Sequence, residues 1–166
     1  MEIISGFPPI SNTHCSILIL GSMPGEKSLA EKQYYAHKYN SFWFILTRIL
    51  RFEQELSYQN KKKLLLKNGI AVWDVLQYCS RKGSLDASIV SKTVIVNDFV
   101  CFFESHPSIK IVYFNGKKAE NLYRKHVMPL LPSTLTLQYV SLPSTSPAMA
   151  MLTKEQKYNQ WLVIQK

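Results

Sequence analysis

Four short segments of this 166-residue chain are almost continuously apolar or β-branched and end in turn residues. They are residues 15–20 before Gly21, residues 70–75, residues 109–114 before Asn115-Gly116, and residues 135–142 before Pro143. A strand that is apolar on both sides must be covered on both faces, which is typical of parallel sheets. The segments therefore predict a central four-stranded, mostly parallel sheet.

Helical patterns lie between these segments. They follow Asn40 and Asp98, each of which can cap a helix, and they cover residues 117–126 and 154–165. Strands that alternate with helices predict an α/β fold, here a three-layer α/β/α sandwich. The length is that of one ordinary domain, and neither a repeat nor a linker composition divides the chain, so residues 1–166 are predicted to form a single domain.

The charge balance favours a polyanionic partner. The net charge is +9, from 20 Lys and Arg against 11 Asp and Glu, and nine Tyr and eight Phe offer surfaces on which bases can stack. Nucleic acid is therefore the favoured partner, although the charge can also serve solubility alone.

The cysteines and the N-terminal residues argue against a metalloprotein, a secreted protein and a membrane protein. Cys15, Cys79 and Cys101 are widely spaced and form no C-x-x-C pair, which disfavours a metal centre and indicates a reducing compartment. The first residues resemble neither a signal peptide nor an anchor, and no apolar stretch approaches membrane-spanning length. We expect a cytoplasmic protein without a metal.

The stretch "GSMPGEKS", residues 21–28, looks like a phosphate-binding loop of the form G-x-x-x-x-G-K-[ST]. Glu26 replaces the second glycine and brings a Cβ and a carboxylate to the anion, so nucleotide binding is disfavoured. Ligands of open parallel sheets bind beyond the carboxyl ends of the strands. Three such ends, at residues 21–25, 115–116 and 143–147, are therefore expected to form one site.

Six motifs in order carry a resemblance to a known family. They are "LGSMPGEKSL", "YYAHKYNSFW", "AVWDV", "RKGSLDASI", "FNGKKA" and "LPSTSPAMA". Together they resemble the uracil-DNA glycosylase superfamily, and most closely its hypoxanthine (deoxyinosine) DNA glycosylase branch. The resemblance implies a small α/β sandwich around a four-stranded parallel sheet.

The resemblance also implies a monofunctional glycosylase that flips a deaminated base out of DNA, hydrolyses its N-glycosidic bond and leaves an abasic site. Extrusion is needed because the bond cannot be approached inside a duplex. The implied partner is DNA with deaminated bases, most of all hypoxanthine. No metal, other cofactor or membrane is implied, and we expect a monomer that reaches the nucleoid through DNA.

The water-positioning residue departs from other branches, which carry Asp or Asn where this chain has Met23. In the hypoxanthine branch an asparagine just before the Phe-Trp pair is thought to take over, and here that residue is Asn40. A helix cap is the alternative role of Asn40. Met23 is then expected to line the base pocket.

Other site roles follow from the same motifs. Tyr35 is expected to stack on the extruded base, with Tyr34 as its core neighbour, although alternation can invert that choice. His37 is expected to donate to base or phosphate, or else to be a surface or capping residue. Ser22 offers a hydroxyl, and Asn115 is expected to recognise the base edge, or simply to form an Asn-Gly turn.

The remaining predicted residues shape the site or contact DNA. Gly21, Pro24 and Gly25 are expected to shape the turn. The predicted DNA contacts are Ser144, Thr145, Ser146 and Lys117 to phosphates, with Pro147 and Met149 as a wedge in the base stack. A core position is the alternative for Met149. Asp74 and Asp86 resemble family positions, but the motifs assign them no role.

Two other functions stay open at this stage. The enzyme can instead excise uracil or mismatched thymine, or the chain can be a catalytically silent module that binds damaged or single-stranded DNA. The absence of a water-positioning side chain at Met23 favours the silent module. Nucleotide binding by residues 21–28 stands well behind because of Glu26.

Overall fold

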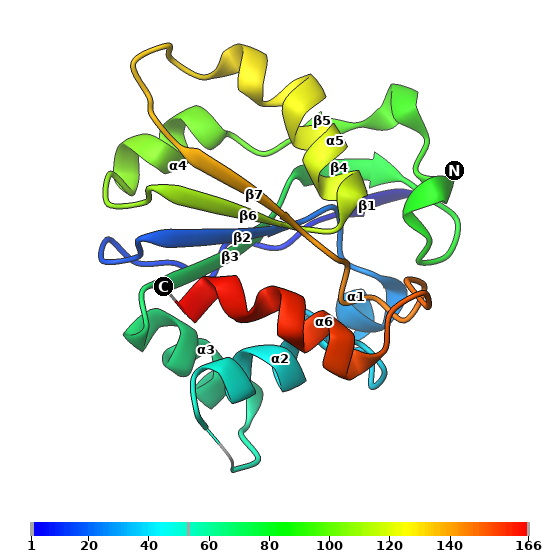
Figure 1. The fold of residues 1–166 in the computed structure, drawn as a ribbon. Coiled ribbons are helices and arrows are strands. Elements are labelled where there is room, and N and C mark those ends of the chain that lie inside the picture. The colour runs from blue at the N-terminus through cyan, green and yellow to red at the C-terminus, as the bar shows by residue number, and fades with distance from the viewer. Residues whose placement is uncertain (1, 53, 166) are drawn as a thin grey trace.

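A four-stranded parallel sheet runs through the middle of the protein (Figure 1). The computed structural model describes residues 2–52 and 54–165. The strands, in the spatial order β3-β2-β6-β7, are β3 (Ile70–Asp74), β2 (Ile17–Gly21), β6 (Ile111–Asn115) and β7 (Gln138–Leu142). All five residues of β3 are buried, as its continuous apolar sequence predicts. The prediction of this sheet is confirmed.

Helices cover both faces of the sheet (Figure 1). Alternate residues of β2 point to opposite faces: Leu18 packs in one core cluster with α4 and α5, and Ile19 packs in the other with α2, α3 and α6. The helices are α1 (Glu26–Glu31), α2 (Phe42–Ile49), α3 (Tyr58–Lys67), α4 (Phe99–Ser105), α5 (Lys117–His126) and α6 (Lys154–Trp161). The predicted three-layer sandwich is therefore confirmed.

A second sheet, which the sequence patterns did not predict, lies beside the first. It is three-stranded and antiparallel, in the order β1 (Ile3–Ser5), β4 (Leu76–Ser80) and β5 (Ile95–Val96). Only Val75 separates β4 from β3, so no Gly or Pro marks the change of sheet. Short 3-10 helices complete the chain: η1 (Asp86–Ser88), η2 (Ser91–Thr93), η3 (Met128–Leu130) and η4 (Leu162–Gln165).

Helix starts follow ordinary capping chemistry. The Asp98 carboxylate accepts a hydrogen bond from the Cys101 N–H at 3.0 Å, so the predicted cap of α4 is present. Over the described ranges, no helix has the length and apolar character that crossing a membrane requires.

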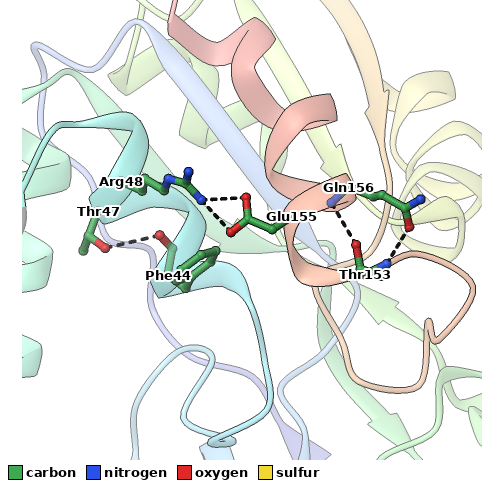
Figure 2. Close-up of polar contacts among 6 residues, drawn as sticks. All are labelled: Phe44, Thr47, Arg48, Thr153, Glu155 and Gln156. Atoms are coloured by element: carbon green, nitrogen blue, oxygen red, sulfur yellow. Dashed lines mark hydrogen bonds and ion pairs between the residues drawn. The ribbon is translucent and has the colours of Figure 1, made fainter.

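The start of α6 carries a reciprocal cap (Figure 2). The Thr153 hydroxyl accepts from the Gln156 N–H at 3.2 Å, and the Gln156 side chain accepts from the Thr153 N–H at 2.8 Å. In the same first turn Glu155 accepts two hydrogen bonds from Arg48 of α2, at 2.8 and 2.7 Å. Because this pair is exposed, it contributes less than the cap does to the stability of α6.

We expect Thr153→Ala to lower the free energy of unfolding by about 1 kcal/mol, because it leaves the Gln156 N–H in the first turn of α6 without its acceptor. Thr153→Ser is the matched control, since it keeps the oxygen, and we expect it to stay within a few tenths of a kcal/mol of the parent. Urea unfolding of the three proteins measures both. Equal stability of the alanine and serine variants would show that the cap is dispensable.

Candidate active site

The carboxyl ends of the parallel strands open into a cavity of about 690 Å³. The loops after β2, β6 and β7 form it together with residues 34–40 and 84–87. It is lined by all the predicted site residues: Gly21, Ser22, Met23, Pro24, Gly25, Tyr35, His37, Asn40, Asn115, Lys117, Ser144, Thr145, Ser146, Pro147 and Met149. Asp74 and Asp86 line it as well. The structure thus brings together residues that are up to 128 positions apart, from Gly21 to Met149.

Gly21 ends β2 where two side chains from other segments approach its backbone. A Cβ at this position would lie 2.5 Å from Asp74 Oδ1 and 3.1 Å from the Tyr35 hydroxyl oxygen. At the first distance a Cβ would force the Asp74 carboxyl to shift, so glycine serves close packing here rather than an unusual backbone angle. It keeps the Asp74 carboxyl and the Tyr35 hydroxyl close to each other at the cavity.

A buried polar network fixes the loop after β2. Ser22 donates to Asp86 Oδ1 at 2.7 Å. The fully buried Arg81 side chain donates to the Gly83 carbonyl at 2.8 Å and to the Pro24 carbonyl, and its Nη1 lies 3.9 Å from Asp86 Oδ1. Burial raises the pKa of Asp86, while the Ser22 hydrogen bond and the Arg81 charge oppose the rise. Arg81 begins the motif "RKGSLDASI", but no local pattern around a single arginine predicts that its side chain is buried.

Asn115 and Thr145 join the ends of β6 and β7. The Asn115 amide donates to Thr145 Oγ1 at 3.0 Å and accepts from the Thr145 N–H at 2.9 Å. Thr145 is fully buried, so its hydroxyl holds the loop and is turned away from solvent. An Asn-Gly turn alone does not require these bonds, and the Asn115 amide also lies close enough to the Tyr35 hydroxyl to oppose the rise in its pKa that burial causes. Recognition of the base edge by Asn115 stays a prediction.

Asn40 lies just before α2, where its side-chain oxygen accepts from the Phe42 N–H at 3.0 Å. Asn40 is thus not the N-cap residue, which is Ser41, but its oxygen satisfies the first N–H of α2 from one position earlier. This contact leaves the amide Nδ2 and a second oxygen lone pair outside it, and Asn40 is half-buried at the cavity. His37 is exposed at the rim, and its Nδ1 accepts from the Tyr39 N–H at 3.2 Å.

Tyr35 has a left-handed backbone conformation, with φ of 55°. One face of its ring stacks on Phe42, with centroids 3.9 Å apart, and the residue is half-buried at the cavity. Its hydroxyl oxygen is buried without a hydrogen bond of regular geometry among the described residues, and the nearby Asn115 amide opposes the rise that burial gives to its pKa. Tyr34 is buried, and its hydroxyl donates to the Pro8 carbonyl at 2.9 Å, as expected of a core neighbour.

Asp74 is the last residue of β3 and is 4% exposed. Its Oδ2 is buried without a hydrogen-bond partner in the described part of the chain. Burial raises the pKa of this carboxyl to about 7, the Asp86 charge adds to the rise, and the Arg81 charge opposes it. The sequence motif contained Asp74, but nothing local to it predicts burial without a partner.

The loop of residues 143–149 is held in place by side chains of α6. Trp161 donates to the Pro143 carbonyl at 2.9 Å, and the buried Lys157 donates to the Ser146 carbonyl at 3.0 Å. Pro147 is exposed and Met149 is half-buried, so the predicted wedge and the alternative core position of Met149 both stay open. Lys117 is exposed at the rim, where it forms an ion pair with Glu120 at 2.8 Å.

Across residues 2–52 and 54–165, no group of three or more His, Cys, Asp or Glu side chains is arranged to hold a metal ion. The cavity is lined by hydroxyls and amides, two tyrosines, a histidine, lysines and the three carboxyls of Glu26, Asp74 and Asp86. Such groups can position water and bind a heteroaromatic ring.

We expect Asp74→Asn to stabilise the protein, and more so at alkaline pH. The folded-state pKa of Asp74 lies above its ordinary value near 4, so stability from this group falls as pH rises from about 4 through 7. An amide cannot ionise and escapes that loss. The advantage of the variant should grow by about 2 kcal/mol from pH 5 to pH 8, measured by urea unfolding. A constant difference would mean that Asp74 titrates normally.

Comparisons with known proteins agree with this geometry. The family model of the uracil DNA glycosylase superfamily matches residues 8–163. A hypoxanthine DNA glycosylase of Methanosarcina acetivorans is 34% identical over 157 residues, which are 94% of each chain. A hypoxanthine DNA glycosylase of Methanosarcina barkeri is 41% identical over 115 residues, covering 69% of this chain and 72% of that protein.

The solved structures give the same family. The solution NMR structure of a candidate uracil DNA glycosylase from Methanosarcina acetivorans superimposes with a TM-score of 0.81 at 32% identity. The match covers 99% of this chain and 97% of that one. By sequence over most of its length and by fold, this chain belongs to the uracil DNA glycosylase superfamily.

Proposed function

We propose that this protein is a monofunctional DNA glycosylase that draws a deaminated base into the cavity at the strand ends and hydrolyses its N-glycosidic bond. Hypoxanthine is the proposed base, because relatives 34% and 41% identical to this chain carry the name hypoxanthine DNA glycosylase. The observation that carries the proposal is the cavity itself, in which the family's motifs meet. Its volume of about 690 Å³ is within the usual range for a small-molecule site.

The cavity supplies what an extruded base requires. A flipped base loses its stacking and pairing partners, and an aromatic ring can replace the stacking. Tyr35 is suited to this task because Phe42 supports one face of its ring while the residue stays half-exposed at the cavity. Hydrogen bonds from Asn115 and Ser22 to the base edge complete the proposed recognition.

Hydrolysis requires a positioned water, and Asn40 is the proposed residue. Met23 lines the cavity but carries only a thioether, which cannot orient water for attack. Asn40 has a fixed side chain because of its bond to the Phe42 N–H, and it keeps its Nδ2 donor and one oxygen lone pair for the water. No step of this reaction calls for a metal ion.

DNA binding is proposed to involve the rim of the cavity. Ser144, Ser146 and Lys117 line the cavity and are the proposed phosphate contacts, and the exposed Pro147 with Met149 forms the proposed wedge. The Thr145 hydroxyl, which the sequence also assigned to phosphates, is buried and is left out of the proposal. The net charge of +9 favours this partner. We further propose that residues 1–166 act as one domain, as a monomer, in the cytoplasm at the nucleoid.

A cleavage panel tests the function. Duplexes with one labelled strand carry hypoxanthine, uracil, xanthine or mismatched thymine, and each is incubated with protein, with and without a chelator, and then treated with alkali. We expect strand breaks at hypoxanthine, unchanged by the chelator. Preferential cleavage at uracil or thymine would replace the proposed substrate. Cleavage of none of them, with DNA still bound, would identify a silent binding module.

We expect Asn40→Ala to slow single-turnover excision of hypoxanthine by about a hundredfold, with DNA affinity within a few-fold of the parent. The variant also loses the bond to the Phe42 N–H at the start of α2, so Asp98→Ala serves as the control for a weakened helix start. Asp98 is the side-chain cap of α4 and does not line the cavity. A folded Asn40→Ala protein with the parent rate, or an equal loss in the control, would refute the catalytic role.

A further inference from the structure

Two buried polar atoms at the cavity lack a hydrogen bond of regular geometry among the described residues: Asp74 Oδ2 and the Tyr35 hydroxyl oxygen. They lie close together, since a Cβ on Gly21 would be 2.5 Å from Asp74 Oδ1 and 3.1 Å from the Tyr35 oxygen. Buried polar groups are almost always satisfied within the protein, and an unpaired one costs stability. A strand end that keeps such a carboxyl unpaired beside a ligand cavity points to a partner in the ligand.

We propose that Asp74 is the general acid of the reaction, which donates its proton to N7 of the purine as the base leaves. This inference rests on the proposed function, because it requires an extruded purine in the cavity. It gives Asp74 a chemical role that neither Asn40 nor Asn115 can fill, since an amide does not release a proton at neutral pH.

The surroundings of Asp74 favour its neutral form. Its pKa is raised to about 7, first by burial and then by the charge of Asp86, against the opposing charge of Arg81. Two tyrosines also interact electrostatically with Asp74: the pKa values of the Tyr34 and Tyr35 hydroxyls are raised first by burial and then by the charge of Asp74. DNA that covers the cavity removes more water and raises the pKa of Asp74 further.

The charge that develops in the reaction also requires the neutral form. As the bond between C1′ and N9 breaks, its electron pair moves into the purine ring, and an ionised Asp74 would repel the departing base. A carboxylic acid instead donates. The proton of Asp74 passes to N7, so the base leaves as neutral hypoxanthine. Water adds to C1′ and loses a proton, which restores the acid.

The choice of N7 explains a preference for purines. N7 belongs to the same five-membered ring as N9, so the electron pair released by bond cleavage makes N7 more basic. Uracil offers no such ring nitrogen: its N1 is the leaving nitrogen, its N3 already carries a hydrogen, and the released charge gathers on its carbonyl oxygens instead. A buried acid at this place therefore accelerates loss of hypoxanthine more than loss of uracil.

The pH dependence of single-turnover excision tests the role. For the parent on hypoxanthine duplex, we expect the rate to fall about tenfold for each pH unit above the pKa of Asp74 in the complex. Asp74→Asn should be about a hundredfold slower at pH 6 and lack this alkaline fall. Asp86→Asn removes a charge that raises the pKa of Asp74, and should move the fall to lower pH.

A substrate that lacks N7 distinguishes proton donation by Asp74 from an effect of Asp74 on the shape of the cavity. We expect the parent to excise 7-deazahypoxanthine slowly, and Asp74→Asn to excise it no more slowly than the parent does. Asp98→Asn, the same chemical change on α4, should match the parent on both substrates, and melting curves establish that each variant is folded.

The outcomes separate the two proposals. If the parent does not excise hypoxanthine, the proposed function fails and this inference fails with it. If the parent is active but Asp74→Asn has the parent rate and pH profile, only the acid role is refuted. Equal slowing of Asp74→Asn on hypoxanthine and 7-deazahypoxanthine would also refute it, since Asp74 would then act on cavity shape.

Discussion

Parallel pairing with matched strand ends is the constraint on which the site depends. Gly21 pairs with Asp74 and Asn115 pairs with Leu142, so strands from four distant parts of the chain stop at one edge. Helices cover both faces of the sheet and keep the strands buried. The carboxyl ends of the strands are not covered by these helices, and the loops that form the cavity lie there. The site is therefore a consequence of the sheet, because parallel strands present their carboxyl ends together.

Two polar contacts over long sequence separations turn this edge into a defined cavity. The Asn115 amide bonds to Thr145 through both its oxygen and its nitrogen, and Ser22 bonds to Asp86 across 64 positions. Inside a protein such contacts are stronger than in water and expensive to leave half-made. Loops that are held in this way can place a reacting base with little further ordering, which preserves binding energy for catalysis.

Asp74 has the opposite effect on stability: it lowers the free energy of unfolding, and it lies beside the cavity. A buried carboxyl without a partner opposes folding once it ionises, and nearby Asp86 increases that penalty. Gly21 adds to the arrangement by omitting the side chain that would cover Asp74. Perturbed groups of this kind cluster in active sites because the environment that weakens folding is also the one that tunes proton transfer.

The sequence by itself determined the parallel sheet, helices α2, α4, α5 and α6, and the meeting of three loops at one edge, since these follow from local periodicity and turn residues. Only the tertiary structure decided the second sheet, the burial of Arg81, the pairing of Asn115 with Thr145 and the unpaired state of Asp74. The reason is physical: burial and partner choice depend on segments that are distant along the chain, whereas hydrophobic period and capping depend on neighbours a few residues away.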